Sequence, residues 1–211
     1  MKLTAVTFTA LSAVSAVTAA MDGYWDVQSP GFRLVVRSSN STYNGTALGA
    51  CHQGAAIEGL CITGETVQDP PSSYTTFYHN VSSARNEAAG AANADGPISW
   101  ILRAGGNLTV PSAMFLALDE TSNVANPTFY PGTDKSTLIA FEEDGCLYIN
   151  ANRDDTVSPP SVFYPSRHVK NWYICLTRYS YTYTTLSWKV GLTGTPQNPS
   201  CQKVDIVRVY N

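Results

Sequence analysis

The stretch Phe32-Arg33-Leu34-Val35-Val36-Arg37 is the clearest strand in this sequence. Phe32, Leu34 and Val36 alternate with Arg33, Val35 and Arg37, which is the period-two pattern of a strand with one buried face. The closing run, residues 203–210, is apolar on both faces, as expected of a strand that is covered on both sides. We therefore expect the C-terminal strand to lie inside the architecture and to pair with the strand that contains Phe32.

Two hairpins are predicted between these strands. Residues 98–102 and 108–110 form two extended runs around Gly105-Gly106. Residues 140–149 form the second hairpin around Asp144-Gly145, a dipeptide that supplies the positive backbone torsions of a tight turn.

The remaining strands are expected at residues 74–81, 114–118, 171–176 and 182–190. Clusters such as Pro70-Pro71 and Pro159-Pro160 separate them and cannot continue a helix. Many short strands without a long helical period predict an all-β fold. The expected architecture is a single-domain antiparallel β-sandwich of the jelly-roll type, with a β-barrel or β-trefoil as the alternatives.

The N-terminal residues have the pattern of a secretory signal peptide. Lys2 precedes an uncharged run over residues 3–20, and small residues stand where a signal peptidase cuts. The run is too rich in Ala, Thr and Ser for a membrane-spanning helix. We expect residues 1–20 to be the signal peptide and residues 21–211 to form one all-β domain that is secreted, with a possible place in the cell wall.

Charge and composition narrow the class of partner. The formal net charge is −3 and only 14% of the residues are charged, with no basic cluster. A weakly acidic surface of this kind argues against nucleic acid or an anionic membrane as the partner. The last residues form no apolar tail, so no membrane anchor is expected. The expected partner is a cell-wall polysaccharide or an extracellular protein, and no cofactor motif is present.

Five cysteines, an odd number, follow the signal peptide. The short segments Cys51 to Cys61 and Cys175 to Cys201 are natural local disulfides, which would leave Cys146 free or paired between chains. No Cys or His pair has the spacing of a zinc site, so no metal site is expected.

Four Asn-x-Ser/Thr sequons are present, and in a translocated chain one or more of them would carry a glycan on the surface. The asparagines are Asn40, Asn44, Asn80 and Asn107.

A run of tyrosines is the candidate binding feature. Tyr179, Tyr181 and Tyr183 share one face of an extended segment, whereas Leu186 and Trp188 share the other. Either a bulge or turn interrupts the segment near residues 184–185, or one set is exposed. Exposed in-line tyrosines would form a flat platform for stacking against sugar rings. Burial of the tyrosines in the core through a register change is the favoured placement.

Enzymatic chemistry is not expected. Glycoside hydrolysis needs two carboxylates across a cleft, and the candidates are best interpreted as solvated turn residues. These candidates are Glu142, Glu143, Asp144, Asp154 and Asp155. No Gly-x-Ser-x-Gly elbow is present, and His52, His79 and His168 are interpreted as polar surface or turn residues.

Several motifs resemble an uncharacterised family of secreted proteins from filamentous fungi. They are the strand at residues 32–36, the run Cys51-His52-Gln53-Gly54-Ala55-Ala56-Ile57-Glu58-Gly59-Leu60-Cys61, Thr76-Phe77-Tyr78, Phe141-Glu142-Glu143-Asp144-Gly145, Trp172-Tyr173-Ile174-Cys175, and the closing segment 185–205. More loosely, the chain is similar to the phialide-associated cell-wall proteins of such fungi. Cys146 departs from the family pattern.

The resemblance implies a glycosylated, non-catalytic role at the cell wall or in the extracellular space. A carbohydrate-binding, lectin-like module that uses the tyrosine face is the first alternative. A secreted effector that binds a host protein is the second.

Overall fold

The computed structural model describes residues 24–85, 91–132 and 134–211, and the expected signal peptide lies outside these residues. Within them the only helix is the single 3-10 turn η1 (Ser83–Arg85). The strands are β1 (Val27–Gln28), β2 (Phe32–Arg37), β3 (Thr46–Gly54), β4 (Ile57–Thr66), β5 (Phe77–Val81), β6 (Gly96–Arg103), β7 (Thr109–Ala117), β8 (Val124–Pro131), β9 (Leu138–Phe141), β10 (Leu147–Asp154), β11 (Ser161–Val169), β12 (Trp172–Arg178), β13 (Thr182–Lys189), β14 (Gln202–Lys203) and β15 (Asp205–Tyr210). A search of the described residues for a helix capable of crossing a membrane found none.

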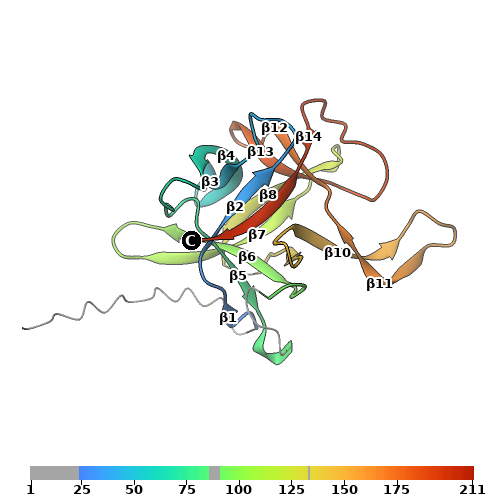
Figure 1. The fold of residues 1–211 in the computed structure, drawn as a ribbon, viewed down its shortest axis with the longest axis horizontal. Helices are drawn as coiled ribbons and strands as arrows, with labels where there is room; N and C mark the ends of the chain where they lie inside the picture. The colour runs from blue at the N-terminus through green and yellow to red at the C-terminus, as the bar shows by residue number, and fades with distance from the viewer. Residues whose placement is uncertain (1–23, 86–90, 133) are drawn as a thin grey trace, which may run out of the picture.

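Eight of these strands form a closed barrel. Their pairings run from β5 through β2, β3, β4, β13, β8, β7 and β6, and the β5–β6 pairing returns to the start. The other strands lie outside this ring (Figure 1). All ladders between the named strands are antiparallel, so the all-β antiparallel class is confirmed. Of the expected architectures, the structure has the barrel and not the sandwich.

The pairing of the C-terminal strand with the strand that contains Phe32 is confirmed. Its expected place inside the architecture is wrong, because β15 lies outside the ring and most of its residues are only half-buried. β15 lies antiparallel to β2 along its whole length, from Asp205 opposite Arg37 to Tyr210 opposite Phe32. β2 is buried on both faces, because Arg33 reaches over the β4–β5 loop and donates to the carbonyls of Thr66, Val67 and Asp69 at 2.7–3.1 Å. The alternation of charge therefore predicted the strand but not the cover on its second face.

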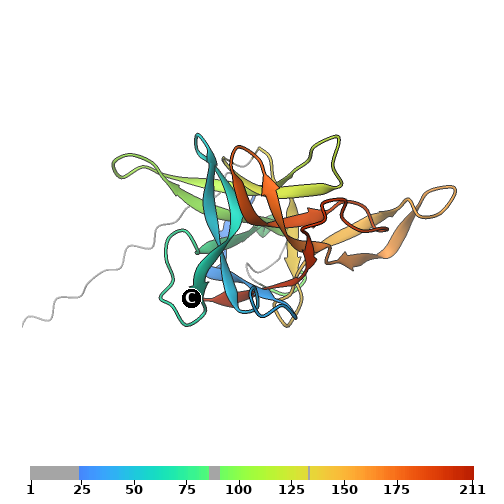
Figure 2. The same ribbon diagram turned by 90° about the horizontal axis from the view of Figure 1, so that it is seen from above.

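Both predicted hairpins are present. β6 pairs with β7 across the Gly105-Gly106 turn, and β9 pairs with β10 across the turn that contains Gly145, whose φ is 83°. β10 continues into a second hairpin with β11, and this β10–β11 arm projects away from the barrel (Figures 1 and 2).

The barrel interior is filled by one apolar cluster to which almost every strand contributes. Trp172 is its largest fully buried side chain. Its indole Nε1 donates to the carbonyl of Leu147 at 2.9 Å, and its ring meets Trp188 edge-on at 4.7 Å. Trp172 therefore joins β12, β13 and β10 in a single packed core.

The structure contains the two disulfides that the spacing favours, Cys51–Cys61 and Cys175–Cys201. Cys146 is a free, buried thiol that lies 3.5 Å from Nη1 of Arg37. Burial raises the pKa of the Cys146 thiol, with the Asp144 carboxylate as a further cause. Since the sulfur is shielded, alkylation of Cys146 requires the protein to unfold.

One sequon asparagine does not have the surface position expected of it. Asn80 in β5 is fully buried, and its Nδ2 donates to Oγ of Ser99 at 2.8 Å. The sequon pattern gives no information on burial, and here the side chain faces the neighbouring strand β6. Asn44 and Asn107 are exposed, and Asn40 is half-buried with its Nδ2 on Gln202.

His79 is also buried, contrary to the surface position expected of it. The ring packs edge-on against Phe141, and Nε2 donates to the carbonyl of Ile139 at 3.1 Å. Burial lowers the pKa of His79 to about 4, because the charged imidazolium loses its water, although the hydrogen bond to Ile139 partly opposes this.

This burial predicts acid sensitivity. The unfolded chain, with a His pKa near 6.5, takes up the proton before the folded chain does, so stability falls as pH drops from about 6.5 to 4. The full loss attributable to His79 is about 3 kcal/mol. Urea unfolding of the wild type and His79→Gln at several pH values isolates this contribution. The two stabilities should converge as pH falls, and parallel curves would contradict the burial of a neutral His79.

Candidate functional site

The tyrosine run lies at the tip of the β12–β13 hairpin. Tyr179 and Tyr181 belong to the turn, and Tyr183 is the second residue of β13. Tyr179 is 48% exposed and Tyr181 is 50% exposed, whereas Tyr183 is half-buried. The favoured placement in the core is therefore wrong, and the exposed alternative holds. The reason is that the turn precedes β13, so Tyr179 and Tyr181 never enter a strand.

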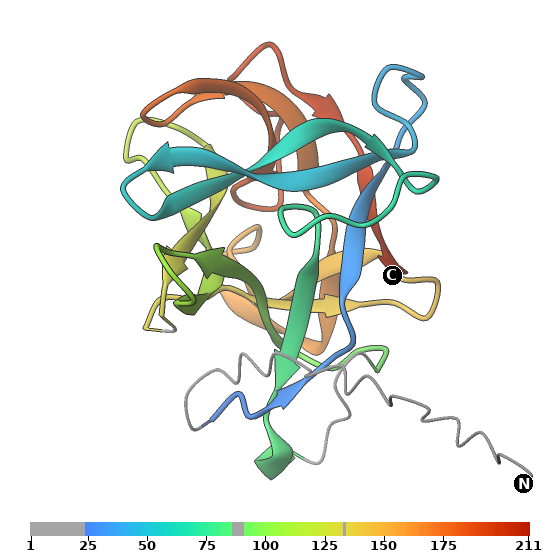
Figure 3. The same cartoon turned by 90° about the vertical axis from the view of Figure 1, so that its left-hand side faces the viewer.

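The exposed rings do not form the expected flat platform. The centroids of Tyr181 and Tyr183 are 6.3 Å apart with planes at 51°, and His52 lies 5.8 Å from Tyr181 at 41°. We call His52, Tyr181 and Tyr183 the aromatic end. The β3–β4 and β12–β13 hairpins that carry it lie side by side, as Figures 2 and 3 show. Its surface is bent, and each ring presents a different angle.

A partly buried carboxyl group lies beside the aromatic end. His52 and Glu58 are opposite each other in the β3–β4 ladder, on the same face as the core residue Leu60 and as Ala50, which packs against the core. Only 13% of the Glu58 side chain is exposed, and its Oε1 is 3.4 Å from Nδ1 of His52. Burial raises the pKa of Glu58, and the contact with His52 opposes that rise. Glu58 therefore takes up a proton more readily than a surface glutamate and can then donate a hydrogen bond.

Gln53 fixes the position of the tyrosine turn relative to the β3–β4 hairpin. Its side chain is buried, and its Oε1 accepts a hydrogen bond from the backbone N–H of Tyr181 at 3.3 Å. The disulfide between Cys51 and Cys61 joins β3 and β4 nearby. The aromatic end is thus built on two hairpins, of which one is cross-linked internally by a disulfide, and a hydrogen bond joins the two hairpins.

Sequence reasoning did not find His52 and Glu58 as partners of the tyrosines. Both are separated from Tyr181 by more than 120 residues. His52 meets Tyr181 only because β4 and β13 are neighbours in the ring, and Glu58 contacts His52. The sequence signal that could have pointed to His52 and Glu58 is the pair of cysteines that flank them, since a disulfide within a hairpin fixes the conformation of its turn.

The carboxylates considered for hydrolysis lie elsewhere. Glu142 is 2.8 Å from Nζ of Lys170 and 3.5 Å from Nδ1 of His168, and Asp144 is 3.3 Å from Nη1 of Arg37. Glu143 and Asp155 are exposed turn residues, and Asp154, the last residue of β10, accepts from Thr156. Across residues 24–85, 91–132 and 134–211, no group of three His, Cys, Asp or Glu side chains could hold a metal ion.

Comparison with known proteins identifies a family but no described activity. A family model described as a domain of unknown function, DUF7907, matches residues 29–210. Neither a curated protein nor a solved structure matches the chain.

The exposure of the aromatic end predicts a contrast between two tyrosines. Tyr181→Ala should lower the free energy of unfolding by less than about 1 kcal/mol, because the ring has few contacts to lose. Tyr148→Ala should cost about 3–5 kcal/mol, because Tyr148 is fully buried and stacks on His168. Chemical denaturation of both variants measures the difference. Equal losses would contradict the exposed placement of Tyr181.

Proposed function

We propose that this chain, which belongs to the DUF7907 family of domains of unknown function, is a secreted, glycosylated, non-catalytic domain that binds polysaccharide at a cell wall or in the extracellular space. The observation that carries the proposal is the aromatic end. Tyr181 and His52 are both exposed on neighbouring hairpins, with their rings next to each other. Grouped, exposed aromatic rings on a soluble domain are characteristic of binding surfaces.

An oxidising environment is compatible with the covalent structure. The two disulfides persist in secreted proteins and are rare in reducing compartments. Asn44 and Asn107 are exposed sequon asparagines, so a glycan at either would extend into solvent. These features and the expected signal peptide support an extracellular place for the domain.

The shape of the aromatic end indicates the kind of polysaccharide. A flat crystalline surface needs coplanar rings, and the planes of Tyr181 and Tyr183 differ by 51°. A single flexible or helical sugar chain can turn one ring toward each side chain. Glu58 and His52 then supply hydrogen-bonding groups for the hydroxyls of the sugar. No bond is made or broken in this proposal.

A protein partner is the second candidate, and the β10–β11 arm favours it. Tyr164 is 98% exposed and Val162 is 74% exposed on β11, which projects from the barrel (Figure 1). Protruding apolar side chains of this kind are common at protein–protein contacts. This surface fits the effector alternative, in which the domain binds a host protein.

Pull-down with insoluble polysaccharides separates the two candidates. Tyr181→Ala should reduce binding to the polysaccharide that the wild-type protein binds at least tenfold compared with the wild type, because the ring supplies much of the stacking area. Tyr164→Ala removes an even more exposed tyrosine on the arm and serves as the matched control, with binding within twofold of wild type. The panel consists of chitin, a β-1,3-glucan and mannan. Loss of binding in Tyr164→Ala with retention in Tyr181→Ala would reject the aromatic end as the binding surface.

A further inference from the structure

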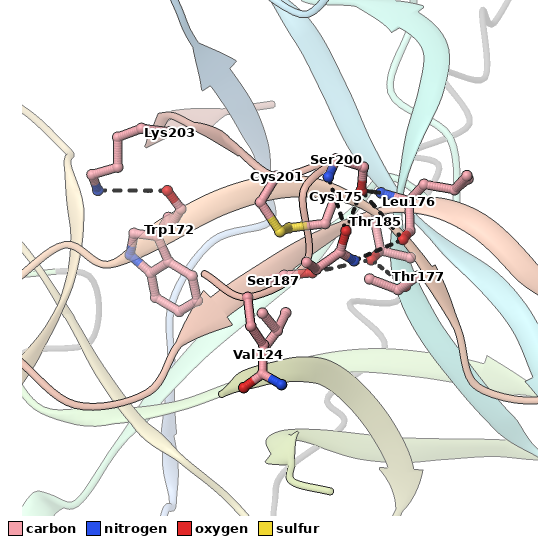
Figure 4. The surroundings of a disulfide bond; sticks show 12 residues. Val124, Trp172, Cys175, Leu176, Thr177, Thr185, Ser187, Ser200, Cys201 and Lys203 are labelled. Atoms are coloured by element: carbon pink, nitrogen blue, oxygen red, sulfur yellow. Dashed lines mark hydrogen bonds between the residues drawn. A yellow bond between two sulfur atoms is a disulfide. The ribbon is translucent and has the colours of Figure 1, made fainter. Parts of the chain in front are cut away.

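A row of buried hydroxyl groups lies on the outer face of β12 and β13. Trp172, Ile174 and Leu186 point into the core, so the alternate residues Thr177, Thr185 and Ser187 point away from it. Their side-chain oxygens form a chain, with 2.7 Å between Thr177 and Thr185 and 3.3 Å between Thr185 and Ser187 (Figure 4). An outward face of a barrel would ordinarily carry such groups in water.

The segment that follows β13 covers this row. Cys201 at its end is bonded to Cys175, and Lys189 at its start donates to the carbonyls of Gly191 and Thr193. Figure 4 shows the disulfide next to Thr185 and Ser200. Because the segment is attached at both ends, the hydroxyl row is held at the base of a rigid wall.

A hollow opens at the end of the row. It has a volume of about 270 Å³, and its lining includes Asp119, Thr121, Asn126, Thr177, Arg178 and Asn198. Asn126 shares the outer face with Ser187, because Ala125 is opposite Trp188 in the β8–β13 ladder. The Oδ1 atom of Asn126 is buried and has no hydrogen-bond partner among the described residues. A buried amide oxygen normally has a partner, so this atom is an unsatisfied acceptor in a residue that lines the hollow.

The charges of the hollow select a neutral ligand. Asp119 is ionised, since the hydroxyl and backbone N–H of Thr121 lower the pKa of its carboxyl. Arg178 brings the opposite charge, so the two compensate each other. Hydroxyl, amide, carboxylate and guanidinium groups together offer donors and acceptors on several sides, as a ring with many hydroxyls requires. The volume is slightly below the roughly 300–1,000 Å³ of pockets that hold drug-sized ligands, which suits a single ring.

The hollow lies on the same face of the β12–β13 hairpin as Tyr183. Thr177 is directly opposite Tyr183 in the β12–β13 ladder, so both side chains lie on the same face. We propose that the hollow binds the terminal ring of an uncharged sugar chain whose following residues stack on Tyr183 and Tyr181. This inference rests on the proposed function and adds to it the position and orientation of the chain.

Isothermal titration calorimetry with two kinds of probe tests the pocket. The short probes are glucose, mannose and N-acetylglucosamine, and the long probes are the hexamers of β-1,3-glucan and chitin. One of the monosaccharides should bind to the wild type. Asp119→Asn and Thr177→Val should each weaken the binding of this monosaccharide at least tenfold, and should weaken the binding of the corresponding hexamer to the same extent. Tyr181→Ala should weaken the hexamer but leave the monosaccharide within twofold. Asp154→Asn is the matched control, because Asp154 accepts from Thr156 as Asp119 does from Thr121.

Each failure has its own signature. A hexamer affinity that depends on Tyr181 but is unchanged in Asp119→Asn and Thr177→Val overturns the pocket and leaves the proposed function standing. Monosaccharide binding that depends on Asp119 and Thr177, without any effect of Tyr181→Ala on the hexamer, supports the pocket and overturns the aromatic end. Absence of binding by the folded wild type to every probe, including the polysaccharides of the pull-down, overturns both.

Discussion

The pairing of β5 with β6 closes the ring of strands, and the remaining architecture depends on this contact. Closure satisfies the backbone hydrogen-bonding groups that open sheet edges would expose. It requires very close approach at Gly96, where an added Cβ would lie 1.8 Å from the carbonyl oxygen of Asn80. Any side chain at position 96 would push β5 and β6 apart. The close approach of β5 to β6 also explains why His79 and Asn80 on β5 are buried.

Because the interior of the ring is filled by packed apolar side chains, binding groups have two places left, the ends of the barrel and its outer face. Both are used in our account. The aromatic end is formed near two hairpin tips, where Tyr181 lies in the turn and His52 and Tyr183 lie on the adjoining strands. The hollow is formed on the outer face, where the segment attached through Cys175–Cys201 covers a row of hydroxyl groups. The two disulfides lie next to these two surfaces and cross-link the segments that carry them.

The sequence predicts the local features of this fold well and the long-range ones poorly. The period-two pattern of β2, the Asp144-Gly145 turn and the short cysteine spacings each act over a few residues, and the structure contains all of them. The choice of barrel over sandwich depends on the distant β5–β6 pairing, and a glycine at position 96 permits this pairing without identifying the partner strand. The contact between Tyr181 and His52 depends in the same way on the order of the strands around the barrel. Asn80 shows the related limit, because a sequon is a motif of three residues whereas burial is decided by the neighbouring strand.

The central claim is that sugar recognition occurs at the end of the barrel formed by the β3–β4 and β12–β13 hairpins. Backbone chemical-shift mapping with β-1,3-glucan and chitin hexamers tests it most directly, because it reports every contact surface at once. We predict shifts confined to residues around His52 and Tyr181–Tyr183 and to the hollow beside Asn126, with the β10–β11 arm unaffected. Shifts confined to the arm around Tyr164, or no shifts with either hexamer, would contradict the account.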